Sequence, residues 1–129
     1  MGKTIAEKIL SNHASRDLKA GEISVVDVDL VFAQDGTGPL AVSQLKKMGF
    51  NNVANKKKSI FFIDHAAPSP RKELSDSHKI LRNFCKTSGA VLSDISQGVC
   101  HQLVAEKYAC PGNIIIGADS HTCTAGALG

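Results

Sequence analysis

The spacing of apolar residues predicts a helix at the start of the chain and a strand after it. Thr4 and Glu7 have the spacing of a capping box, and apolar residues follow them at helical intervals. We therefore expect a helix over about residues 4–13. Apolar residues then alternate with acidic ones, which predicts a strand over residues 23–32.

Further along the chain, the pattern continues to alternate between helices and strands. The apolar runs at residues 59–63 and 113–117 are continuous, which is typical of strands buried on both faces. The other predicted elements are a turn-rich loop at 34–39, a helix to about residue 48, a helix at 71–88, a short strand at 91–92, a helix at 99–108 and a loop rich in Gly, Thr and Ser after residue 117. Strands that alternate with helices indicate an α/β fold with a largely parallel sheet flanked by helices.

Composition fits a single folded domain over residues 1–129. Hydrophobic residues make up 43% of the chain and charged residues 21%, as in globular proteins. Tryptophan is absent and aromatic residues make up 5%, so we expect a core of aliphatic side chains. The length of 129 residues is that of one ordinary domain.

The charge gives little reason to expect a nucleic-acid partner. The net charge is only +3. Lysines gather at residues 46–47 and 56–58, but no aromatic residue interrupts either run, and nucleic-acid surfaces usually combine the two. We expect a solvated surface there, with attraction of an anionic substrate as the alternative.

The cysteines and the short apolar runs indicate a cytoplasmic protein with free thiols and no membrane partner. No two cysteines form a C-x-x-C pair, which argues against a zinc ribbon or a thioredoxin-like site. No run approaches the ~18 apolar residues of a membrane span. The first residues also lack the pattern of a signal peptide. The four cysteines are Cys85, Cys100, Cys110 and Cys123.

Two pairs of aspartate and histidine follow the continuous apolar runs. Asp64 and His65 come directly after one run, and Asp119 and His121 come shortly after the other. Because ligands of open α/β sheets bind beyond the carboxyl ends of the strands, we expect both pairs in one crevice. A carboxylate beside an imidazole fixes its tautomer and holds its charge for proton transfer. One such pair alone is more often a turn cap, but two pairs favour an active site.

The other three histidines differ in their surroundings. His101 begins a predicted helix, where an anion is favoured, and is therefore a further candidate. His13 and His78 lie within predicted helices, and we expect them at the surface or half-buried. Gln34 and Asp35 sit at the end of an earlier strand, in the place that corresponds to the two pairs.

A zinc site is an alternative interpretation of the same histidines. Three imidazole nitrogens and one water can hold a catalytic zinc, and His65, His101 and His121 would be the ligands. No short H-x-x-x-H element supports such a site. We therefore predict no metal ligands in this chain.

Six short motifs follow one another along the chain. They are Thr-Ile-Ala-Glu-Lys-Ile-Leu at 4–10, Gln-Asp-Gly-Thr-Gly-Pro at 34–39, Asp-His at 64–65, Gly-Val-Cys-His-Gln at 98–102, Gly-Ala-Asp-Ser-His-Thr at 117–122 and Thr-Ala-Gly-Ala-Leu-Gly at 124–129. In this order and spacing they resemble the aconitase superfamily, and within it the large subunits of 3-isopropylmalate dehydratase and homoaconitase. The resemblance implies that residues 1–129 correspond to the first α/β domain of the aconitase fold. The later cluster-binding and swivelling domains would then be absent from these residues.

The resemblance also implies roles for the candidate residues. The implied catalytic residues are Asp64, His65, His101, Asp119 and His121. Among them His65 would protonate the hydroxyl that leaves the substrate, while the others support it or lie near the cofactor and substrate. Gln34 and Ser120 would hydrogen-bond carboxylate or hydroxyl groups of the substrate. The implied reaction is reversible loss of water from a 2-hydroxy acid and its return at the neighbouring carbon.

The cofactor and partners that the resemblance implies lie mostly outside these residues. A 4Fe-4S cluster would act as the Lewis acid, held by three cysteines that this chain does not contain. A small dehydratase subunit, the swivelling domain, would supply a serine base. We therefore expect the 129-residue chain alone to be inactive, and its uncovered apolar surface to favour self-association.

The function that the resemblance favours is interconversion of 2- and 3-isopropylmalate, a step of leucine biosynthesis. The alternatives within the enzyme class are homoaconitase and other 2-hydroxy acid dehydratases. An alternative of another class is a non-catalytic module that binds anions. The residues themselves do not choose among the substrates.

Overall fold

Four parallel strands form the centre of the structure, a computed structural model that describes residues 2–129. The strands are β1 (Leu30–Gln34), β2 (Ser59–Phe62), β3 (Val91–Ser93) and β4 (Ile115–Gly117). Their order across the sheet is β3-β2-β1-β4, and every neighbouring pair is parallel. The predicted α/β fold with a parallel sheet is confirmed.

The chain reverses its direction across the sheet beside β1. The connections from β1 to β2 and from β2 to β3 step one way, and the next connection returns to place β4 on the other side of β1. The register sets Phe32 of β1 beside Ile60 of β2 and Gly117 of β4. In open α/β sheets such a reversal leaves a crevice at the carboxyl ends of the strands on either side, which here are β1 and β4.

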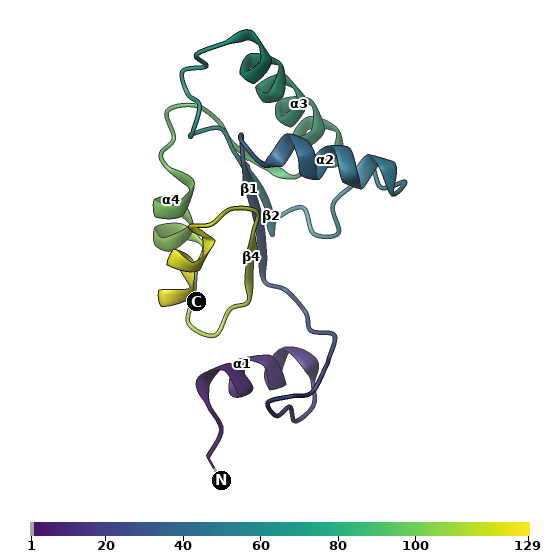
Figure 1. Cartoon of the computed structure of the whole chain (residues 1–129), viewed down its shortest axis with the longest axis vertical. Coiled ribbons are helices and arrows are strands. Elements are labelled where there is room, and N and C mark those ends of the chain that lie inside the picture. The colour runs from purple at the N-terminus through teal and green to yellow at the C-terminus, as the bar shows by residue number, and fades with distance from the viewer. Residues whose placement is uncertain (1) are drawn as a thin grey trace.

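Helices cover both faces of the sheet (Figure 1). α2 (Gly38–Lys47) and α3 (Lys72–Ser88) lie on one face, and α4 (Cys100–Lys107) and the 3₁₀ helix η1 (Thr122–Ala127) lie together on the other. The first face buries Ala33, Val42, Phe61, Ile63, Leu81, Phe84, Cys85 and Ala90, and the second buries Leu30, Phe32, Ile60, Phe62, Cys100, Leu103, Val104 and Ala125. None of the helices in residues 2–129 is long and apolar enough to cross a membrane.

The first helix, α1 (Ile5–Ala14), lies apart from the sheet near the amino end of β1 (Figure 1). Its predicted capping box is present: Thr4 accepts from the backbone N–H of Glu7, and the Glu7 carboxylate accepts from that of Thr4. Nε2 of His13 lies 2.6 Å from Oδ2 of Asp29, which ties the end of α1 to the start of β1.

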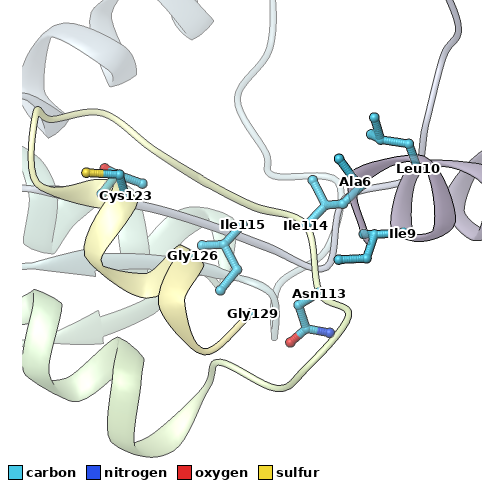
Figure 2. Close-up of a pocket in the computed structure, with 10 residues that line it drawn as sticks. Ala6, Ile9, Leu10, Asn113, Ile114, Ile115, Cys123, Gly126 and Gly129 are labelled. Atoms are coloured by element: carbon cyan, nitrogen blue, oxygen red, sulfur yellow. The ribbon is translucent and has the colours of Figure 1, made fainter. Parts of the chain in front are cut away.

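An apolar cavity of about 340 Å³ lies between α1 and the β4–η1 segment (Figure 2). Ile9 and Leu10 line it from α1, and Ile115 lines it from β4. None of the site residues predicted from the sequence lines this cavity. It therefore lies beside the predicted active site, which it meets at Thr122.

The predicted strand at residues 23–32 is wrong over most of its length. β1 begins only at Leu30 and continues to Gln34. Ile23 and Val25 are 96% and 93% exposed, and Val26 and Val28 are only half-buried. One acidic residue of the alternating pattern has another role, because the carboxylate of Asp29 accepts the backbone N–H of Ile114 at 3.0 Å.

Two expectations near the end of the chain also need correction. β4 covers only part of the predicted strand, and Ile116 is 50% exposed because β4 is the edge strand over residues 2–129. The segment rich in Gly, Thr and Ser is a loop only over residues 118–121, and Thr122–Ala127 forms η1 instead. Its first turn closes when the backbone N–H of Thr124 donates to the carbonyl of His121 at 3.0 Å.

Candidate active site

The loop after β2 holds Asp64 and His65 in a fixed pair. Nδ1 of His65 lies 2.9 Å from Oδ1 of Asp64. Oδ2 of the same carboxylate accepts the backbone N–H of Cys100, at the start of α4, at 2.6 Å. Because an ionised carboxylate only accepts hydrogen bonds, Nδ1 carries the proton of this contact, and Nε2 is left for proton exchange.

The two groups shift each other's pKa in opposite directions. Burial alone would raise the pKa of Asp64, but hydrogen bonds from His65 and the Cys100 N–H outweigh it and lower the value. The hydrogen bond to Asp64 raises the pKa of His65, against a smaller opposite effect of burial. The imidazole therefore keeps its second proton to a higher pH than an ordinary histidine. With 37% of its side chain exposed, His65 can deliver that proton to a ligand.

Asp119 follows β4 and faces His101 of α4. Its Oδ2 lies 2.9 Å from Nε2 of His101, a distance suited to an ion pair, yet the atoms are not aligned for a hydrogen bond. Nε2 of His101 is consequently a buried polar atom without a hydrogen-bond partner in residues 2–129. The hydroxyl of Thr122 donates to Oδ1 of Asp119 at 2.7 Å and fixes the carboxylate. Burial would raise the pKa of Asp119, but Thr122 and the nearby imidazoles lower it.

Three imidazoles from three segments gather at this edge of the sheet. The ring centroid of His101 lies 5.7 Å from that of His65 and 5.7 Å from that of His121. The structure thus brings all five residues predicted to be catalytic to the carboxyl ends of β2 and β4 and the start of α4. This position agrees with the crevice expected beside the chain reversal. The roles of the residues in catalysis remain a prediction.

The two residues predicted to contact substrate lie differently. Gln34 ends β1 and is only 8% exposed, and its side-chain oxygen accepts the backbone N–H of Gly36, so it shapes the turn after β1. Ser120 is exposed between Asp119 and His121. Contact of either residue with a substrate remains a prediction.

A buried pair that the sequence did not reveal lies behind the site. The expectation that His78 is at the surface or half-buried is wrong, because it is 2% exposed and its Nε2 lies 3.0 Å from Oδ2 of Asp35. Asp35 is 1% exposed. The signal for His78 was its place on the apolar stripe of α3, in line with Leu81 and Cys85, both buried.

Several groups at the site have the composition of metal ligands. His101, Asp119 and His121 offer ligand atoms within 4.8 Å of one another. Two other groups have the same spacing: His65 with Cys100 and His101, and Asp35 with Asp64 and His65. The two sets that contain His101 use the zinc-type ligands imidazole, carboxylate or thiol.

Fold and site together define an α/β segment whose histidines and aspartates gather at the carboxyl ends of parallel strands. The profile of the aconitase family (aconitate hydratase) matches residues 7–129, and the chain belongs to this family. Over its own whole length, this chain is 67% identical to the 3-isopropylmalate dehydratase large subunit of Elusimicrobium minutum. It is 56% identical to large subunit 1 of that enzyme from Thermotoga maritima over the same residues. Large subunit 2 of Archaeoglobus fulgidus is 49% identical. The chain spans 31% of the length of each of these relatives.

Family membership implies an iron–sulfur cluster in general, but the cysteines of residues 2–129 do not fit one. Cluster ligands are thiolates brought together in space. Burial raises the pKa of the Cys85 thiol to about 11, and burial with the Asp64 charge raises the pKa of Cys100 further. Cys110 and Cys123 are exposed, and no candidate metal group in the described part of the chain contains more than one cysteine. These residues do not supply the ligands of a cluster.

Proposed function

We propose that this chain is the acid–base segment of a hydro-lyase that interconverts 2- and 3-isopropylmalate, a step of leucine biosynthesis. The proposal rests on the aconitase family and on relatives that are named 3-isopropylmalate dehydratase large subunit. Since the chain spans only 31% of those relatives, the activity belongs to the complete enzyme. These 129 residues carry the histidines and aspartates of the site, but they are inactive without the rest of the enzyme.

The observation that carries the proposal is the fixed Asp64–His65 pair. The contact of His65 Nδ1 with Asp64 fixes the orientation of the His65 ring. The centroid of the neighbouring His101 ring lies 5.7 Å from that of His65. Loss of water from a 2-hydroxy acid needs a proton donor for the departing hydroxyl, because hydroxide is a poor leaving group. His65 donates this proton from Nε2, and the carboxylate of Asp64 stabilises the imidazolium before the transfer.

The remaining residues bind and orient a substrate that carries negative charge. His101 and His121 present imidazoles beside Asp119, whose position Thr122 fixes. Imidazoles at this edge donate hydrogen bonds to substrate carboxylates when protonated. Gln34 and Ser120 add polar groups at the ends of β1 and β4, where they bind carboxylate or hydroxyl groups of the substrate.

The cofactor and partner of the complete enzyme follow from the family. We assign it a 4Fe-4S cluster whose ligand cysteines lie outside these 129 residues. The relatives are named large subunits, and we assign the complete enzyme a small subunit as partner. The part of the reaction that belongs to residues 2–129 is therefore binding, orientation and proton transfer.

Turnover of the complete enzyme on three hydroxy acids tests the proposal. A full-length large subunit that carries this segment is assayed anaerobically with its small subunit on 3-isopropylmalate, homocitrate and citrate. We expect the highest kcat/KM for 3-isopropylmalate. A preference for homocitrate would assign a homoaconitase instead. No dehydration of any of the three, with ligand binding retained, would contradict the enzyme and leave an anion-binding module.

A further inference from the structure

We propose that Asp35, supported by His78, is a positioning residue for His65. The buried carboxylate of Asp35 fixes the turn that carries the imidazole without reaching the reacting atoms itself. This inference rests on the proposed function of His65 as proton donor. It concerns a residue pair that lies behind the site and not one of the five residues at its surface.

Asp35 reaches the turn because its strand lies beside β2. β1 and β2 are paired in register up to Gln34 and Phe62, so Asp35, the residue after β1, lies close to the turn that follows β2. Oδ1 of Asp35 accepts the backbone N–H of His65 at 3.1 Å, and Oδ2 accepts that of Ala66 at 2.9 Å. One carboxylate therefore holds two consecutive amides of the turn.

His78 supplies the third hydrogen bond to the same carboxylate. It projects from α3, and its Nε2 lies 3.0 Å from Oδ2 of Asp35. Both residues are almost fully buried, with 2% of His78 and 1% of Asp35 exposed. A buried carboxylate is costly unless donors surround it, and here each donor comes from a group that the fold holds in place.

These contacts determine where the proton donor points. The turn fixes the position of the His65 backbone. That position and the contact with Asp64 together fix the orientation of the His65 ring. A displacement of roughly 1 Å in a reacting group can cost about 100-fold in rate. In Asp35→Asn the side chain keeps one acceptor oxygen, so its NH₂ group would face one of the two backbone N–H groups. The turn would then shift, and with it His65.

A double-mutant cycle in the complete enzyme tests this role. Asp35→Asn, His65→Ala and the double variant are assayed on the substrate, with Asp76→Asn as control, an exposed aspartate of α3 that pairs with Lys79. We expect Asp35→Asn to lower kcat about 100-fold with little change in KM, and to have less than about a threefold effect when His65 is already alanine. Equal losses in both backgrounds would contradict a role exercised through His65, as would normal kcat in Asp35→Asn.

Two further measurements keep the test decisive if Asp35→Asn folds poorly. His78→Gln retains an N–H donor for Asp35, whereas His78→Leu removes it, so kcat should fall about tenfold in the leucine variant and recover in the glutamine variant. Hydrogen exchange of the peptide around His65 should speed up in His78→Leu, with α1 as the unaffected reference. Unchanged exchange and kcat in both variants would overturn the inference. Normal turnover in His65→Ala would contradict the proposed function instead, which separates the two failures.

Discussion

A hydrogen bond to Asp64 is the largest influence on the pKa of His65, and this contact should be visible in the pH dependence of the complete enzyme. The carboxylate raises the pKa of His65 above its ordinary value of 6.5. A general acid works only while protonated, so kcat should persist until the pH rises past the raised pKa. In Asp64→Asn the alkaline limb should move to lower pH, toward the ordinary value.

The measurement is the pH profile of kcat for the wild type, Asp64→Asn and the surface control Asp76→Asn. The control removes one negative charge from an exposed position and should leave the limb in place. An alkaline limb that stays where it is in Asp64→Asn would show that this histidine does not set the profile.

At the residue scale, local sequence rules placed part of the site and missed the rest. The strand-end rule anticipated the position of Asp64 with His65, because both follow a buried strand directly. The contact between Asp35 and His78 joins residues 43 positions apart. No local spacing encodes such a pair, which depends on α3 packing over the ends of β1 and β2.

At the element scale, α3 packs through a stripe of buried side chains, and Leu81 lies fully buried within it. Leu81 is fully buried against the sheet, whereas its neighbour Ile80 is 45% exposed. Leu81→Ala should lower the free energy of unfolding by about 2–5 kcal/mol because it removes buried methyl groups and leaves a cavity. Ile80→Ala should change it by about 0.5 kcal/mol or less. Urea unfolding of the two variants measures the difference, and equal losses would refute the assigned packing.

The tether between α1 and β1 should depend on pH. The Ile9 carbonyl and Asp29 raise the pKa of His13, so its contribution to stability is complete below the unfolded value of 6.5 and is lost as the pH rises through the higher folded value. The Ile114 N–H and His13 lower the pKa of Asp29, so its contribution is present above 3.8 and is lost as the pH falls through the lower folded value. The tether is therefore strongest between these two ordinary values.

Thermal unfolding of the wild type and His13→Asn over this range tests the tether. The difference in Tm should be largest between the two ordinary values and should shrink as the pH rises past 6.5 through the raised pKa of His13. Proteolysis between α1 and β1 should speed up in the variant under the same acidic conditions. A Tm difference that is constant with pH would contradict a charged contact between His13 and Asp29.

Prediction of the elements succeeded where apolar spacing reflects packing and failed where it does not. The apolar run at 59–63 contains β2, and side chains packed on both faces of the sheet bury it. Alternation at 23–29 suggested a strand, yet the segment has no strand partner within residues 2–129, and its Asp29 side chain binds the Ile114 N–H. The periodicity of apolar residues indicates that a segment has an apolar face. The strand or helix that would cover this face lies elsewhere in the sequence and is not indicated by the pattern.

At the scale of the whole molecule, the isolated 129-residue chain should bind no 4Fe-4S cluster and should self-associate. Three thiolates do not meet anywhere in residues 2–129. Val31 and Ile116 leave apolar surface on the sheet, at 44% and 50% exposure, and an apolar cavity opens beside α1 (Figure 2). Anaerobic reconstitution with iron and sulfide, visible absorbance and light scattering test both expectations. A stoichiometric cluster on a monomeric chain would contradict them.

The central claim is that this segment supplies the proton donor of a dehydratase, and turnover of His65→Ala tests it most directly. The variant is compared in the complete enzyme with His13→Ala, which removes a histidine far from the site on α1. We expect kcat for 3-isopropylmalate to fall roughly 100- to 10,000-fold in His65→Ala, the usual cost of a lost general acid, with a much smaller change in substrate affinity. His13→Ala should stay near the wild type. Near-normal turnover in His65→Ala would contradict the assignment of His65 as the proton donor.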